Sequence, residues 1–238
     1  MKISIALMEK LSFSPNNPVI ESLIKKYNSG FVTGIYGNAA SGKTTSCLLA
    51  AIEIAKSNTK VIYVDTESTF NSERLKQLCN SDFDTIIENV FLLQPKSFEQ
   101  QHETILKLHK LCSNDKIKLV VVDTIGNHYR VAVKEDPKMI NSMMAMQVQT
   151  LIRIARDMNK VVLITNQVTS RMDTKDEINM IGGKLIMNMC RCIIELNKKD
   201  SKRYATLIKY KMEDEQPSPF EIGKKVMFDI REKGLFLL

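Results

Sequence analysis

Short runs of consecutive apolar residues alternate with longer segments in which apolar residues recur at helical spacing, from about residue 30 to residue 165. The short runs are rich in Val, Ile and Leu on both faces, which is typical of strands covered by helices on both sides. The predicted strands are residues 31–36, 60–65, 89–93, 118–123 and 160–165. The predicted helices are residues 43–56, 72–79, 97–112 and 138–158, with Ser72 and Ser97 as N-caps.

This alternation predicts an α/β protein whose right-handed crossovers build a mostly parallel, twisted sheet flanked by helices. From residue 190 the pattern changes to three strand-like runs with short connections, 190–196, 204–211 and 225–230. Residues 198–202 have the composition of a hairpin tip, so we expect antiparallel strands at the C-terminal end of the sheet. In such a sheet, ligands bind at the carboxyl ends of the parallel strands.

Composition narrows the class of protein further. Hydrophobic residues make up 44% of the 238, which excludes a disordered chain, and 9 Gly with 6 Pro exclude a collagen-like one. An uncharged apolar run long enough to span a membrane is absent from the sequence. Five cysteines without metal-binding spacing, and no signal peptide, predict free thiols and a cytoplasmic protein. The net charge of +7 favours a polyanionic partner without identifying one.

The strongest chemical signal is a phosphate-binding loop. Residues 37–44 read Gly-Asn-Ala-Ala-Ser-Gly-Lys-Thr and match Gly-x-x-x-x-Gly-Lys-[Ser/Thr], directly after a predicted strand and at the start of a predicted helix. We expect Lys43 to neutralise the β- and γ-phosphate oxygens and Thr44 to supply a hydroxyl group to Mg²⁺. The predicted nucleotide-binding residues of the loop are Gly37, Asn38, Ala39, Ala40, Ser41, Gly42, Lys43, Thr44 and Thr45.

Two acidic residues follow other predicted strands. Asp123 ends the run Leu-Val-Val-Val-Asp, and we expect it on a strand next to that of the phosphate loop, where it holds Mg²⁺ through water. The alternative is an aspartate that simply starts a turn. Glu67 follows strand 60–65 at the same edge of the sheet and is the candidate base for the attacking water. Its alternative is a solvated acidic loop residue.

Five blocks of the sequence occur in an order that is known from one protein family: the phosphate loop, the stretch 64–75, the run ending at Asp123, Leu-Ile-Thr-Asn-Gln-Val at 163–168 and Ile-Gly-Gly at 181–183. This is the order seen in RecA/RadA recombinases. The chain resembles that family from about residue 30 to residue 211. The Thr-Glu-x-Thr-Phe and Thr-Asn-Gln-Val blocks separate it from P-loop kinases and small GTPases. The resemblance implies a single RecA-like P-loop ATPase core over 30–238, a short segment at 1–29, and ATP with Mg²⁺ as cofactors. The helical DNA-binding domain that usually precedes the core is expected to be missing.

The resemblance also implies residue roles. Glu67 matches the water-activating glutamate, Arg74 the arginine that stacks on adenine, and Gln167 the glutamine that senses the γ-phosphate. Together with Lys43, Glu67 and Gln167 form the predicted catalytic set. The alternative for Gln167 is a strand-end amide that satisfies backbone groups.

Residues 127–137 and 168–181 match the two loops that line the DNA channel in the family. The candidate DNA contacts in these loops are Arg130, Lys134, Arg171 and Lys175, and the alternative is ordinary surface charge. The bases near the hairpin tip, which either extend the DNA surface or are solvated, are Lys198, Lys199, Lys202 and Arg203. Lys209-x-Lys211 resembles a pair that completes the neighbouring protomer's ATP site in bacterial RecA, and its alternative is a lysine-bearing sheet edge.

Departures from the family pattern bear on activity. Both loops are shorter than in active recombinases, and the first lacks the family's Gly-Arg-Gly stretch. Acids lie among their few bases: Glu135, Asp136, Asp173, Asp176 and Glu177. Asn71-Ser72 and Ser68 replace the family's Arg-Pro and Gly beside the catalytic glutamate. We therefore expect slow hydrolysis and no full strand exchange.

The predicted function is an ATP-binding, weakly hydrolysing accessory protein of homologous recombination and repair. Its expected partners are single-stranded or branched DNA, a RadA-type recombinase or other recombination proteins, and further copies of itself. One alternative is a KaiC-like regulatory ATPase that binds proteins rather than DNA. A P-loop kinase is a third interpretation, which the Thr-Asn-Gln-Val block disfavours.

Overall fold

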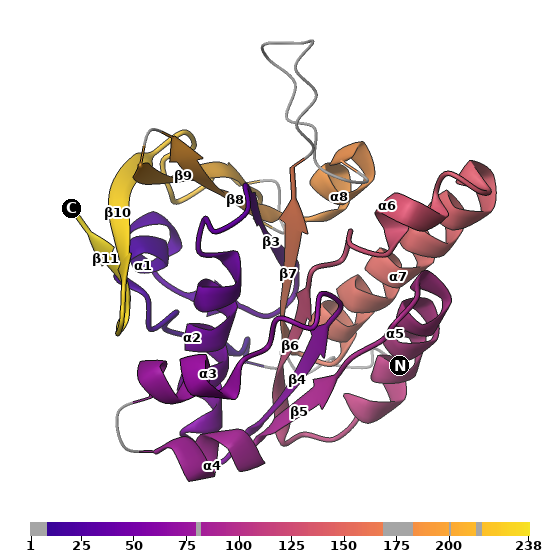
Figure 1. The fold of residues 1–238 in the computed structure, drawn as a ribbon, viewed down its shortest axis with the longest axis horizontal. Coiled ribbons are helices and arrows are strands. Elements are labelled where there is room, and N and C mark those ends of the chain that lie inside the picture. Colours follow the sequence, from indigo (N-terminus) through magenta and orange to yellow (C-terminus); the bar gives the residue numbers. More distant parts are fainter. Residues whose placement is uncertain (1–8, 80–81, 169–182, 200, 213–215) are drawn as a thin grey trace, which may run out of the picture.

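The computed structural model describes residues 9–79, 82–168, 183–199, 201–212 and 216–238. In this part of the chain one sheet of nine strands has the order β11-β10-β9-β8-β3-β7-β6-β4-β5 (Figure 1). The strands are β3 (Val32–Gly37), β4 (Lys60–Asp65), β5 (Val90–Leu93), β6 (Ile117–Asp123), β7 (Val161–Gln167), β8 (Cys192–Lys199), β9 (Lys202–Tyr210), β10 (Lys225–Arg231) and β11 (Gly234–Leu237). Pairing is parallel from β8 to β5 and antiparallel from β8 to β11, which confirms the predicted fold class.

Helices cover both faces of the sheet. One layer holds α1 (Pro18–Ile24), α2 (Lys43–Ala55), α3 (Ser72–Leu78) and α4 (Phe83–Glu88). The other holds α5 (Phe98–Leu111), α6 (Tyr129–Ala132), α7 (Pro137–Asp157) and α8 (Gly183–Met189). Each layer has its own hydrophobic cluster, so neighbours on a strand such as Ile35 and Tyr36 belong to different clusters. This double burial explains the uninterrupted apolar runs.

Two details of the predicted elements are wrong. The run 89–93 does not form a strand buried on both faces, because β5 lies at the edge of the sheet with Phe91 49% and Leu92 38% exposed. The N-cap of α3 is Asn71 rather than Ser72, since the Asn71 side chain accepts from the backbone N–H groups of Glu73 and Arg74 at 2.8 and 3.1 Å. Ser97 does cap α5, as predicted.

Short elements escaped the sequence patterns. Helices α1, α4, α6 and α8, each of seven residues or fewer, were not predicted. Strands β1 (Ser12–Phe13) and β2 (Tyr27–Asn28) form a separate two-stranded pair near the N-terminus. Strand β11 pairs antiparallel with β10 and forms one edge of the sheet.

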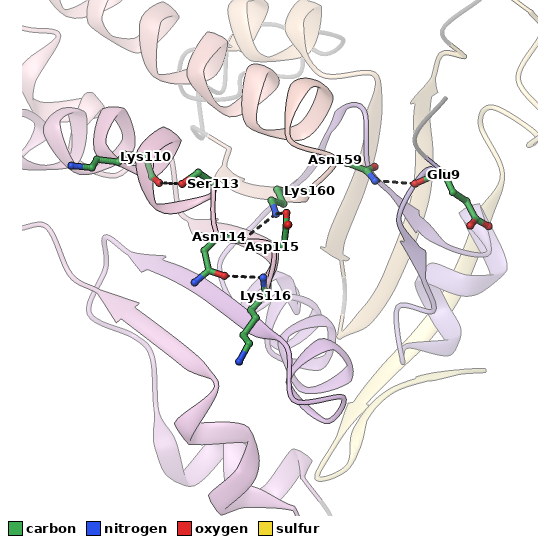
Figure 2. Close-up of polar contacts among 8 residues, drawn as sticks. All are labelled: Glu9, Lys110, Ser113, Asn114, Asp115, Lys116, Asn159 and Lys160. Atoms are coloured by element: carbon green, nitrogen blue, oxygen red, sulfur yellow. Dashed lines mark hydrogen bonds and ion pairs between the residues drawn. The ribbon is translucent and has the colours of Figure 1, made fainter. Parts of the chain in front are cut away.

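Polar contacts fasten the N-terminal segment at the end of the sheet opposite the phosphate loop (Figure 2). Asn159, between α7 and β7, donates from Nδ2 to the Glu9 carbonyl at 2.9 Å and accepts from the Leu11 N–H at 3.1 Å. The neighbouring Lys160 is 2% exposed and donates to the Asn114 carbonyl at 3.2 Å. The segment after residue 9 is therefore anchored to the body of the protein.

All five cysteines are buried free thiols. No helix within the described ranges has both the length and the apolar character needed to cross a membrane.

Candidate nucleotide-binding site

The phosphate loop joins the carboxyl end of β3 to the start of α2, and close contacts dictate its glycines. A Cβ on Gly37 would lie 1.7 Å from the Leu196 carbonyl oxygen of β8. Gly42 has φ +104°, and a Cβ there would lie 3.1 Å from the Ile230 side chain. Glycine is therefore required at both positions, at Gly37 by the neighbouring strand and at Gly42 by its left-handed backbone.

Lys43 occupies the first residue of α2 and is 7% exposed. Its Nζ donates to the carbonyl oxygens of Gly37 at 3.0 Å and Asn38 at 2.7 Å. Burial lowers the pKa of Lys43, and the negative charges of Asp123 and Glu67 oppose that shift. A buried ammonium beside a helix N-terminus is an arrangement suited to phosphate groups.

The hydroxyl group of Ser41 gives an independent sign of a ligand. It is fully buried and has no hydrogen-bond partner among the described residues. Buried polar groups in proteins nearly always have a partner, and a phosphate oxygen held by the loop would supply one. The loop therefore has the chemistry that a nucleotide phosphate requires.

A cleft of about 470 Å³ opens beside the loop, a size typical of small-molecule sites. It is lined by Ala39, Ala40, Ser41, Gly42, Lys43, Thr44, Thr45, Glu67, Thr69, Thr124, Gln167, Arg203 and Ile230. The cleft therefore brings together three predicted residues that are distant in sequence: Lys43 at the start of α2, Glu67 after β4 and Gln167 at the end of β7. Sequence reasoning had not placed Thr69, Thr124, Arg203 or Ile230 there.

Glu67 is held by two side chains that are distant in sequence. Its Oε1 accepts a hydrogen bond from Gln167 Nε2 at 2.6 Å and one from Thr124 Oγ1 at 3.1 Å. Thr124 directly follows Asp123, and the Thr66 hydroxyl donates to its carbonyl at 2.7 Å. The ends of β4, β6 and β7 thus meet at one carboxylate.

Asp123 lies deeper, 1% exposed, and is not among the residues that line the cleft. Its carboxylate accepts hydrogen bonds from the Tyr63 hydroxyl at 2.8 Å and from the Thr165 hydroxyl. Burial and the nearby carboxylate of Asp123 raise the pKa of Tyr63, which keeps that donor protonated. The expectation that β6, the strand that ends at Asp123, lies next to β3, the strand before the phosphate loop, is wrong, because β7 lies between them.

Arg74 lies against the turn between β10 and β11. Its guanidinium donates to the carbonyl oxygens of Arg231 at 3.1 Å and Glu232 at 2.9 Å, and to Gln77 Oε1 at 3.1 Å. It is not among the cleft-lining residues. Its stacking on adenine stays a prediction.

The remaining candidate residues are scattered. Arg130 on α6 and Lys134 just after it are exposed, whereas Arg171 and Lys175 lie outside the described residues. Lys209 donates to the carbonyl oxygens of Met187 and Asn188 at the end of α8 within the same chain, and Lys211 is exposed beyond the end of β9. A role of this pair in a neighbouring protomer's site stays a prediction.

Comparison with known proteins agrees with this geometry. The family model described as Rad51 matches residues 18–234. The DNA repair and recombination protein RadB of Methanosphaera stadtmanae is 34% identical over 239 residues, covering 99% of this chain and 100% of the relative. RadB of Archaeoglobus fulgidus is 32% identical over 231 residues, covering 96% and 99%.

A solved structure described as the RadB recombinase superposes with a TM-score of 0.75 at 30% identity, covering 93% of this chain and 97% of that one. The likeness therefore extends over nearly the whole chain in both sequence and fold. With the phosphate loop, the sheet order and the family match in agreement, the chain belongs to the Rad51 family.

Proposed function

We propose that this protein is an ATP-binding, slowly hydrolysing accessory protein of homologous recombination and DNA repair, similar to RadB. The observation that carries the proposal is the shared cleft of Lys43, Glu67 and Gln167 beside the phosphate loop. Relatives over nearly the full length are named DNA repair and recombination proteins, which supports the biological context.

In this proposal the loop amides and the Ser41 hydroxyl bind the phosphates, and Lys43 balances their charge. Thr44, which lines the cleft, would supply a hydroxyl ligand for Mg²⁺, and Asp123 would hold the ion through water. When bound, Mg²⁺ would supply positive charge that stabilises the leaving group. The hydrogen bonds from Tyr63 and Thr165 fix the Asp123 carboxylate for that task.

Glu67 acts on the attacking water as a general base or orienting group. The bonds from Gln167 and Thr124 restrict its carboxylate to one position facing the cleft. Gln167 ends β7, directly before the segment matched to the second DNA loop. A change at the γ-phosphate therefore reaches that segment through a single side chain.

For DNA, the exposed cations Arg130 and Lys134 contact phosphates, while the neighbouring acids Glu135 and Asp136 limit affinity. Asp136 also caps α7, since its Oδ1 accepts from the Met139 N–H at 3.0 Å. DNA binding is therefore modest and salt-sensitive, which suits a protein that assists a full-length recombinase of the same family.

The test is a mobility-shift titration with single-stranded DNA, with and without ATP, over a range of salt. We expect binding at ~50 mM salt, with log affinity falling linearly with log salt. Replacing both Arg130 and Lys134 by Ala reduces the slope by about 1 to 2, whereas the matched pair Lys107 and Lys110, exposed on α5, leaves it unchanged. Absence of binding at ~50 mM salt, with ATP still bound, contradicts the DNA assignment and favours the KaiC-like alternative.

A further inference from the structure

Arg203 is less exposed than the other basic residues of the β8–β9 hairpin. Lys198, Lys199 and Lys202 are exposed, but only 19% of the Arg203 side chain is exposed and it lines the nucleotide cleft. Consecutive residues of a strand point to opposite faces, so Lys202 and Arg203 differ in direction although both start β9. A charged group inside the cleft needs an explanation that a solvated hairpin tip does not.

Among the residues that the structure describes, the contacts of Arg203 leave most of its N–H donors available to a ligand. Its Nε lies 3.5 Å from the Ala40 carbonyl oxygen of the phosphate loop, and one terminal nitrogen lies 3.5 Å from the Asp229 carboxylate of β10. Both distances are at the long limit for hydrogen bonds. A guanidinium carries five N–H donors in a planar fork that matches phosphate oxygens. The two long contacts hold it beside the loop without saturating it.

The sheet order indicates which phosphates Arg203 faces. Glu67 and Gln167 come from β4 and β7, on one side of β3, whereas Arg203 comes from β9 on the other side. The γ-phosphate has to meet the water held by Glu67. The opposite side of the cleft, shared by Arg203 and Ile230, therefore faces the α- and β-phosphates.

We propose that Arg203 is a second phosphate-binding cation of the nucleotide site, supplied by the same chain and directed at the α- and β-phosphates. This rests on the nucleotide binding proposed above. It assigns to the β8–β9 hairpin a role in holding nucleotide that differs from a DNA-binding role. Because the cation comes from within the chain, it acts in a single protomer without assembly.

The test measures equilibrium binding of ATP and ADP to purified full-length variants. We expect Arg203→Ala to weaken ATP and ADP by a similar factor, about tenfold to a hundredfold, because a charge-assisted hydrogen bond is lost with each. Lys202→Ala removes the same charge one residue away and is expected to match the unsubstituted protein. Arg203→Lys keeps the charge but not the fork and recovers only part of the affinity.

Three outcomes overturn the inference. If Arg203→Ala and the unsubstituted protein bind ATP and ADP with equal affinity, Arg203 makes no contact with the phosphates. Loss of ATP affinity alone contradicts the assignment to the α- and β-phosphates. If Arg203→Ala loses affinity for DNA but not for nucleotide, Arg203 belongs to the DNA-binding surface instead. If the unsubstituted protein and Lys43→Ala both fail to bind ATP, the proposed function fails instead. Unchanged thermal unfolding of Arg203→Ala shows that its loss of affinity does not come from a loss of the fold.

Discussion

The Gln167 side-chain amide donates to the Glu67 carboxylate across 2.6 Å, although the two residues are 100 positions apart. Strand β6 lies between β7, which ends at Gln167, and β4, which ends two residues before Glu67, so the bond spans two strand spacings at the carboxyl ends of the strands. It connects the proposed catalytic carboxylate to the start of the segment matched to a DNA loop. We therefore predict that Gln167 acts by positioning Glu67.

Gln167→Ala is expected to lower kcat for ATP hydrolysis by about tenfold, since loss of a positioning contact costs on the order of one to two kcal/mol. The nucleotide dissociation constant should change less than about twofold, because the phosphate loop remains intact. Steady-state kinetics with a parallel binding titration separates the two effects. Gln100→Ala, an exposed amide on α5, serves as the control. An unchanged kcat in Gln167→Ala would contradict the positioning role.

Gly37→Ala tests the packing of the phosphate loop against β8. Its Cβ would lie 1.7 Å from the Leu196 carbonyl oxygen, so β3 and β8 must separate. We expect a loss of more than about 3 kcal/mol in the free energy of unfolding, measured by urea titration. Gly223→Ala is the matched control, with φ +87° but nothing within 4 Å of the new Cβ, and should cost only about 1 kcal/mol. Equal losses in the free energy of unfolding for Gly37→Ala and Gly223→Ala would contradict the close contact between Gly37 and Leu196.

The buried thiols predict a loss of stability in alkali. Burial raises the pKa of Cys190 and of Cys192 to about 12 and that of Cys112 to about 11. Above the ordinary thiol pKa of about 8.5, the unfolded chain loses these protons while the folded protein keeps them. The free energy of unfolding therefore falls as pH rises, by about 1.4 kcal/mol per pH unit for each thiol until its folded pKa is reached.

Urea unfolding between pH 8 and pH 10.5, chosen to span the range from roughly the ordinary thiol pKa to just below the raised values, measures this slope. Cys190→Ala should make this slope shallower by the contribution of one thiol, about 1.4 kcal/mol per pH unit. The difference between the two proteins isolates Cys190 from the buried tyrosines. A slope identical in the two proteins would mean that Cys190 titrates normally in the fold.

The sequence was informative where a local pattern decides the structure. Strand β4 begins and ends where the apolar run does, and the phosphate loop follows β3 and opens α2 as its motif requires. Local patterns failed where the neighbour in space matters. The edge position of β5 and the place of β7 between β3 and β6 depend on the strand order, which no single run of residues reveals.

The same reason explains the cleft residues that were missed. Thr124 directly follows Asp123, and that position was the one available signal of its role. Arg203 had the sequence context of a solvated hairpin base, and only the pairing of β9 with β8 and β10 brings it to the phosphate loop. The cap at Asn71 was missed because Asn and Ser are both good N-caps and stand side by side.

Single-turnover hydrolysis of ATP, compared in the unsubstituted protein, Glu67→Gln and Lys43→Ala, tests the central claim most directly. We expect slow hydrolysis in the unsubstituted protein, none in Glu67→Gln with ATP binding retained, and loss of binding in Lys43→Ala. Glu67→Gln keeps the shape and one acceptor oxygen at the position held by Gln167 and Thr124, so only the carboxylate chemistry is removed. Turnover in Glu67→Gln at the unsubstituted rate would contradict the assignment of Glu67 as the residue that activates the attacking water in this cleft.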